Sequence, residues 1–162
     1  MERYEECRDS ALKQINLADH VLTMTYPMVQ DPKLLKVVVK NIYQAMESTI
    51  AMILNYERYY KRVPPFTENY EVMLEMSRPI FTNYKISTGY IGFLNEIKEI
   101  LEIQKQSDVE FVRKEKIVFA SKDYDLNAIS VKEIKDYIAK AKLFMQEVMN
   151  VVKENERRDG KC

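Results

Sequence analysis

The stretch DPKLLKVVVKNIYQAMESTIAMILNYERYYKRVPPF, residues 31–66, decides the fold. It opens with Asp31-Pro32, a helix-capping residue followed by a proline suited to the first helical position. Apolar, small and aromatic residues then recur at alternating steps of three and four, close to the heptad period of a helix that buries one seam. They are Leu35, Val38, Ile42, Ala45, Thr49, Met52, Tyr56 and Tyr59. Pro64-Pro65 stops the pattern because neither residue supplies a backbone N–H, so the stretch predicts one helix from Pro32 to about Arg62.

Four further segments show helical spacing of their apolar residues. Pro27 lies late in the first segment and is expected to kink or end it, and Pro79 is expected to bend or split the second. The last segment begins at Ser130, where Ser-Val-Lys-Glu forms a capping box. The four predicted helices run from 2 to about 29, from a cap at Thr67 to Tyr84, from a cap at Ser87 or Thr88 to about 106, and from Ser130 to about 152.

The composition also favours long helices. The 162 residues include three glycines and five prolines, too few for the many tight turns of a sandwich, a barrel or a doubly wound fold. We therefore predict an all-α fold: an antiparallel helical bundle of about five helices, with the first, second and last helices at its centre. Residues 1–152 are expected to form a single domain, and the charged, apolar-poor residues 153–162 a tail that frays.

One segment, residues 107–129, lacks the helical period. Two β-prone runs, 109–112 and 117–119, flank four charged residues there. This pattern favours a short hairpin or an irregular extended arm inserted before the last helix. A connection of this length inside a compact bundle is unusual, and unusually long connections are often functional.

The sequence lacks the residue patterns of the common catalytic and metal sites. His20 is the single histidine, and thirteen residues separate it from Cys7 on the same predicted helix. That spacing is roughly 20 Å, so the two side chains cannot form a catalytic pair within one chain. No Glu-x-x-His motif, Cys/His cluster or glycine-rich phosphate loop occurs. We predict no metal and no cofactor, and the sequence favours a protein that is not an enzyme.

Charge and hydropathy predict a cytoplasmic protein that does not contact membranes. The chain carries 25 Lys+Arg and 25 Asp+Glu, so no global field draws it to nucleic acid or to an anionic bilayer. The longest near-apolar stretch, 49–54, is far too short to span a membrane, and residues 1–6 are too acidic for a signal peptide. Cys7 and Cys162 form no disulfide pattern, which is typical of a reducing compartment.

The end of the predicted 32–62 helix is a candidate ligand-binding patch. Cations alternate with aromatic residues in Arg58, Tyr59, Tyr60, Lys61 and Arg62. Such a composition is typical of surfaces where bases stack and phosphates are gripped. The alternative interpretation is structural, because tyrosines can continue the core stripe and cations complement the dipole at a helix C-terminus.

A second candidate patch lies on the inserted arm, at Arg113, Lys114 and Lys116. A loop tip with this charge could hold a phosphate or an acidic partner. The alternative is a solvated turn between two buried runs. If both patches serve nucleic acid, they are expected to converge on one face of the protein or of its dimer.

Four segments resemble a small family of uncharacterised archaeal helical proteins: ADHVLTMTYPMVQDPKLL, YERYYKRVPPF, SDVEFVRKEKIVFASKDY and KAKLFMQEV. This resemblance spans roughly residues 15–150 and brings no activity or catalytic residue with it. The architecture also resembles HEPN-type bundles, which often bind nucleotides or cut RNA. HEPN ribonucleases carry an arginine, four to six residues, then a histidine. The matching positions before His20 hold Ile15, Gln14 and Lys13, so the resemblance implies a non-catalytic member.

Two main functional hypotheses follow. The first is a non-enzymatic helical binding or oligomerisation module with a protein partner. We expect it to be a homodimer, because the predicted 32–62 and 130–152 helices carry heptad-like stripes and because Ala45, Ser48 and Ala51 allow close helix approach. The second is a HEPN-like RNA- or nucleotide-binding protein that uses the two basic patches. An enzyme of unrecognised type is a third alternative.

Overall fold

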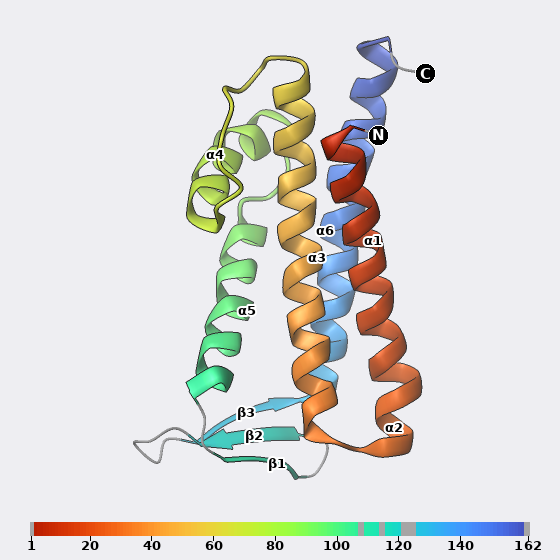
Figure 1. The fold of residues 1–162 in the computed structure, drawn as a ribbon, viewed down its shortest axis with the longest axis vertical. Coiled ribbons are helices and arrows are strands. Elements are labelled where there is room, and N and C mark those ends of the chain that lie inside the picture. Colours follow the sequence, from red (N-terminus) through yellow and green to blue (C-terminus); the bar gives the residue numbers. More distant parts are fainter. Residues whose placement is uncertain (1, 107–108, 114–115, 121–125, 161–162) are drawn as a thin grey trace.

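The computed structural model describes residues 2–106, 109–113, 116–120 and 126–160. The chain forms an all-α helical bundle with a small antiparallel sheet at one end, as Figure 1 shows. The helices are α1 (Arg3–His20), the π-helical turn η1 (Val21–Thr25), α2 (Tyr26–Val29), α3 (Pro32–Tyr59), α4 (Tyr70–Asn83), α5 (Gly89–Gln106) and α6 (Val131–Arg158). The strands are β1 (Val109–Arg113), β2 (Lys116–Ala120) and β3 (Leu126–Ser130).

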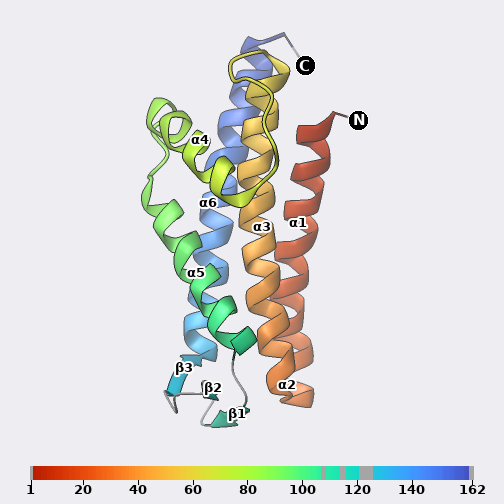
Figure 2. The same ribbon diagram turned by 60° about the vertical axis from the view of Figure 1, so that its left-hand side comes forward.

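Helix α3 is the central element of the bundle. It contacts α1, α4, α5 and α6, and every residue from Ala51 to Glu57 is buried. A helix that is apolar on most of its circumference is stable only when other helices surround it. This agrees with the prediction that the first, second and last predicted helices form the centre of the bundle; Figures 1 and 2 show α1, α3 and α6 side by side.

Pro27 shapes the end of the first helical segment. Just before it the chain widens into the π-helical turn η1, where the Tyr26 N–H donates to the Val21 carbonyl five residues earlier. The prediction that this helix ends near residue 29 is confirmed. Gln30 then takes a left-handed conformation with φ of 54°, and Asp31 caps α3 by accepting from the Lys33 N–H at 3.0 Å.

Helix α4 differs from its predicted form in two respects. Its cap is Asn69, whose side chain accepts from the Glu71 N–H at 2.9 Å, so the prediction of a cap at Thr67 was wrong. Pro79 lies inside the helix without splitting it. At the next helix, Ser87 Oγ accepts from the Gly89 N–H at 3.1 Å, as one of the two predicted caps requires.

The inserted segment is a three-stranded antiparallel meander in the order β1-β2-β3. Strands β1 and β2 form the predicted hairpin, with Arg113 opposite Lys116 in the register. The third strand, 126–130, was not foreseen. It leads directly into α6, whose predicted cap is confirmed: Ser130 Oγ accepts from the Glu133 N–H at 3.0 Å.

The prediction of a frayed tail over 153–162 requires a correction. Helix α6 continues to Arg158, Asn155 on its last turn is buried, and Asp159 hydrogen-bonds to α3. The chain is ordered as far as Asp159 because Tyr56 on α3 and Arg62 just after this helix hydrogen-bond to its carboxylate. Figure 2 shows the end of α6 beside the end of α3. None of the described helices is both long and apolar enough to pass through a bilayer.

Candidate functional site

The predicted basic-aromatic patch at the end of α3 is built around an internal ion-pair cluster. Arg62 donates through Nε to Glu57, which is only 3% exposed, and through Nη2 to Asp159 at 3.2 Å. The Tyr56 hydroxyl donates to the same Asp159 carboxylate at 2.7 Å. The Arg62 guanidinium lies 5.5 Å from the Tyr56 ring centroid and 5.1 Å from that of Tyr60. Arg62 therefore joins α3 to the end of α6.

The hydrogen bonds of this cluster favour the ionised form of Asp159. The hydrogen bond from Tyr56, followed by the one from Arg62, lowers the pKa of Asp159 below its ordinary value. Burial, followed by the hydrogen bond to Asp159, raises the pKa of Tyr56. Two of the five N–H donors of the Arg62 guanidinium are therefore committed to carboxylates of the protein itself.

Of the other residues of this patch, some pack against neighbouring rings and others are exposed to solvent. Tyr60 packs edge-on against Tyr59, with ring centroids 5.0 Å apart, and Tyr59 itself is 49% exposed. Arg58 lies over the Phe66 ring at 5.9 Å. Lys61 is exposed and adopts a left-handed φ of 59°, which turns the chain back so that Arg62 can reach Glu57. The structural interpretation accounts for most of this patch.

The second predicted patch lies at the opposite end of the bundle. Arg113 and Lys116 are paired in the backbone register at the end of the β1–β2 ladder, and Lys114 lies outside the described residues. The sheet contacts the ends of α3 and α6 remote from the first patch (Figure 1). Because the 28 residues of α3 rise about 42 Å, the structure does not bring the two patches of one chain together.

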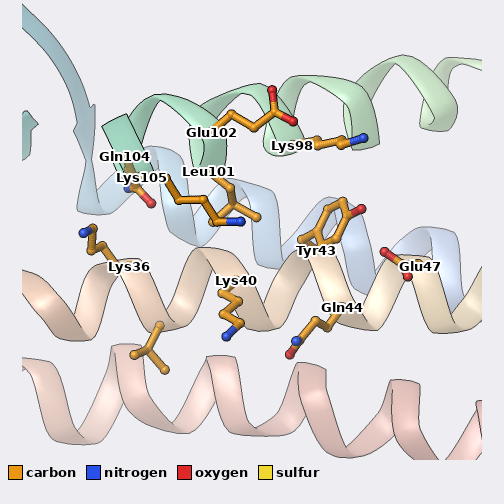
Figure 3. A pocket seen from close by; sticks show the side chains of 11 residues that line it. Lys36, Lys40, Tyr43, Gln44, Glu47, Lys98, Leu101, Glu102, Gln104 and Lys105 are labelled. Carbon is orange, nitrogen blue, oxygen red and sulfur yellow. The ribbon is translucent and has the colours of Figure 1, made fainter. Parts of the chain in front are cut away.

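The structure instead reveals a cleft between α3 and α5, with a volume of about 520 Å³. Figure 3 shows its side chains projecting from the two facing helices. The α3 side is lined by Lys36, Val37, Lys40, Tyr43, Gln44 and Glu47, and the α5 side by Lys98, Leu101, Glu102, Gln104 and Lys105. We call this hollow the α3–α5 cleft. Its volume falls within the range of small-molecule sites.

The lining of the α3–α5 cleft is positively charged. It includes four lysines and two glutamates, which leaves a net charge of two positive units in a chain whose total formal charge is zero. Lys36 and Lys40 lie one turn apart on α3, and Lys98 and Lys105 lie two turns apart on α5. Like charges gathered around one hollow repel each other and attract an anion.

The four lysines differ in their existing contacts. Lys98 is held at the edge of the cleft: its Nζ is 3.4 Å from the Glu71 carboxylate and 3.9 Å from the Tyr70 ring centroid. Lys40 and Lys105 are exposed, and neither has a carboxylate partner in the part of the chain that the structure describes. These two side chains, one from each helix, are the best placed to bind an incoming anion.

Gln104 is the most unusual residue of the cleft. It is only 2% exposed, yet neither its amide nitrogen nor its amide oxygen has a hydrogen-bond partner among the described residues. Buried polar groups in folded proteins are nearly always paired, since leaving one unpaired costs free energy. Packing of the fold does not explain why an unpaired amide is buried in the lining of a cleft.

Tyr43 borders the other part of the cleft. Burial, followed by the neighbouring Glu47 carboxylate, raises the pKa of its phenol. The Tyr43 ring also packs against Tyr70, with centroids 5.7 Å apart. This tyrosine therefore stays protonated at neutral pH and provides a fixed aromatic wall.

The α3–α5 cleft was not predicted from the sequence, although part of its signal is present there. Lys36 and Lys40 recur at helical spacing on one helix, and Lys98 and Lys105 do so on another. Taken alone, each pair is typical of a solvated helix face. The sequence contains no local sign that α3 packs against α5, and it is this pairing that gathers the four lysines.

The basis for the predicted homodimer also changes in the structure. Ala45 is fully buried and Ala51 nearly so, and Ser48 Oγ lies 3.4 Å from Ser10 Oγ on α1. The stripe of α6, including Phe144, is buried in the same bundle. The stripes that favoured self-association are thus occupied within one chain, and the homodimer stays a prediction.

Comparisons with known proteins give no analogue for this site. No family model, no curated protein and no solved structure matches the chain. Among the described residues, no three histidine, cysteine, aspartate or glutamate side chains gather closely enough to hold a metal ion.

Proposed function

We propose that the protein is a non-enzymatic binding module whose α3–α5 cleft binds a small anion. The observation that carries this proposal is the gathering of four lysines around one hollow by two facing helices. Val37 and Leu101 give the hollow apolar contact surface, so that charge and packing can act together. Lys40 and Lys105 are the principal anion contacts, because each is exposed and lacks a carboxylate partner among the described residues.

The chemistry of the lining supports binding rather than catalysis. The residues that line the cleft include no cysteine, histidine, serine or threonine. Enzymes that form covalent intermediates most often place one of these side chains beside an activating base. Lysine ammonium groups on flexible stems instead act as point charges for anions.

The alternative of RNA binding through the two predicted patches has less support. Arg62 donates to two carboxylates inside the protein, and the sheet that carries Arg113 and Lys116 lies at the other end of the bundle. A surface for nucleic acid needs phosphate contacts along a continuous path. We therefore assign the anion site to the α3–α5 cleft instead of to these patches.

Titration calorimetry with inorganic pyrophosphate tests the proposal. We expect the wild-type protein to bind pyrophosphate at low salt and to lose affinity as salt rises, because screening weakens the attraction of the lysines. The double substitution Lys40→Gln/Lys105→Gln is expected to weaken binding at least about tenfold, equivalent to about 1.4 kcal/mol.

The matched control is Lys13→Gln/Lys153→Gln, which removes the same charge from exposed positions of α1 and α6 outside the cleft. It should change the affinity by less than about twofold, since distant exposed charges are screened. Equal losses in the two double variants, or no binding of millimolar pyrophosphate by the wild-type protein, would refute the anion site.

A further inference from the structure

We propose that the ligand of the α3–α5 cleft carries an amide edge, an N–H beside a C=O, next to its anionic group. This inference rests on the proposed anion site and names the chemistry that completes it. Its basis is Gln104, whose carboxamide is buried in the wall of the cleft with both polar atoms unpartnered among the described residues.

The primary amide of Gln104 has two N–H donors and one carbonyl acceptor. A group that donates and accepts at adjacent atoms can satisfy both sides of it at once. A simple phosphate or carboxylate accepts only, and would leave the Gln104 carbonyl unpaired. The buried amide therefore selects a ligand with an amide edge over one that is merely anionic, because an unmatched partner leaves buried polar atoms without hydrogen bonds.

The positions of the side chains allow both groups of one small molecule to bind. Gln104 and Lys105 are adjacent in α5, and Leu101 lies on the same stretch of helix one turn earlier. Figure 3 shows Gln104 at the end of the cleft near Lys36, with the Lys105 side chain reaching toward the middle, above Lys40. The amide edge belongs at Gln104, the anion between Lys105 and Lys40, and the apolar body of the ligand against Leu101.

Two common sources share this chemistry: a pyrimidine nucleotide, whose base has a cyclic amide, and an N-acylated acidic amino acid. The experiment compares each source with a counterpart that lacks the amide. The probes are uridine 5′-monophosphate against ribose 5-phosphate, and N-acetyl-aspartate against succinate. We expect the wild-type protein to bind at least one amide-bearing probe about tenfold or more tightly than its counterpart, and the pair that shows this ratio identifies the source.

Gln104→Met is the matched variant, since it keeps the length and most of the volume of the side chain and removes both polar atoms. We expect it to abolish the preference for the amide-bearing probe while the affinity for pyrophosphate changes by less than about twofold. We also expect the melting temperature of the free protein to rise by about 2–4 °C, because the unpaired buried amide has been removed. A purely structural glutamine would give a lower melting temperature instead.

The outcomes separate this inference from the anion site itself. If pyrophosphate binds and both amide-bearing probes bind no better than their counterparts, the amide edge is refuted while the anion site stands. If pyrophosphate does not bind, both fail. A preference that survives in Gln104→Met also refutes the assignment to Gln104. The comparison of probes on the wild-type protein needs no variant, so the test holds even if the substitution impairs folding.

Discussion

At the scale of single residues, Arg62 shows how one side chain can fix the ends of two long helices. The left-handed conformation of Lys61 turns the chain, the Arg62 N–H donates to the Glu57 carbonyl at 2.8 Å, and the guanidinium then reaches Glu57 and Asp159. The planar arginine fork can serve two carboxylates at once, which a lysine ammonium cannot do with the same geometry. Arg62 is therefore a structural residue.

Replacing Arg62 is expected to destabilise the fold. Arg62→Met removes the cation that pairs with the buried Glu57 carboxylate, and we expect a loss of about 1–3 kcal/mol in the free energy of unfolding, measured by urea denaturation. Arg62→Lys should recover only part of it. The control Arg58→Met removes an exposed cation that lies over Phe66 and should cost less than about 1 kcal/mol. Equal losses at the two positions would contradict this role.

Asp159 gives the cluster a pH dependence whose sign follows from the pKa. The hydrogen bond from Tyr56, and then that from Arg62, lowers the pKa of Asp159 in the folded state below the ordinary value of 3.8. Its stabilising effect is thus fully present above about pH 4 to 5 and is lost as the pH falls through the lowered folded-state pKa. We expect Asp159→Asn to melt at a lower temperature than the wild-type protein at pH 7.

The gap between the two melting temperatures should narrow as the pH falls toward 2, because the wild-type aspartate then also becomes neutral. Glu68 shares this sign, since its hydrogen bonds with Arg3 lower its pKa in the same way. Because Glu68 is present in both proteins, its effect on the melting temperature cancels when the two are compared. A gap that stays constant from pH 7 to 2 would show that Asp159 acts through its shape and not through its charge.

At the scale of elements, the sequence predicted what depends on local signals. Asp31-Pro32 at the start of α3 and the Ser130 cap of α6 were both confirmed, because caps act within one turn of the helix. The cap of α4 was misplaced at Thr67 because Asn69 is an equally suitable capping residue two positions later. Strand β3 was missed because its partner strand, and not its own pattern, defines it.

The end of α6 was mispredicted for a similar reason. Residues 153–158 read KENERR, which shows no apolar stripe. In the structure Val152 and Asn155 face the core, and Asp159 bonds to Tyr56 on α3, more than 100 positions away in the chain. A polar segment can be ordered by such distant polar partners, which periodicity does not reveal.

Truncation tests the contribution of this last segment. A chain that ends after residue 152 loses Asn155, Arg158 and Asp159, and with them the carboxylate that binds Tyr56 and Arg62. We expect its melting temperature to fall by about 4–10 °C, which corresponds to about 2–3 kcal/mol. Hydrogen exchange should accelerate in the last turn of α3. A chain that ends after residue 160 is the control and should melt like the full chain. If both truncated chains melt at the same temperature, residues 153–160 contribute nothing to stability, as the prediction of a frayed tail implies.

At the scale of the whole molecule, the chain has a net charge of zero but a local region of positive charge. The formal charges sum to zero, yet packing α3 against α5 places four lysines around one hollow. The predicted patches were chosen because their cations are neighbours in sequence. The cations of the α3–α5 cleft are neighbours only in space, since they come from helices separated by α4 and two connections.

The position of the cleft predicts that its ligand stabilises the entire fold. One wall is α3, which contacts α1, α4, α5 and α6, so the site cannot persist when the bundle unfolds. A ligand that binds only the folded state at 100 times its Kd adds about 2.7 kcal/mol, which is expected to raise the melting temperature by roughly 5–10 °C. Thermal denaturation with increasing pyrophosphate measures this shift.

Thermal denaturation of the two double lysine variants shows whether the lysines of the cleft cause this shift. Without ligand, Lys40→Gln/Lys105→Gln should melt at or slightly above the wild-type temperature, because the substitution relieves repulsion among lysines without breaking an ion pair of the described residues. With pyrophosphate, its melting temperature should hardly move, whereas Lys13→Gln/Lys153→Gln should shift like the wild-type protein. A stabilisation of equal size in all three proteins would mean that pyrophosphate acts on the surface at large, and the lysines of the cleft would then have no special part in binding.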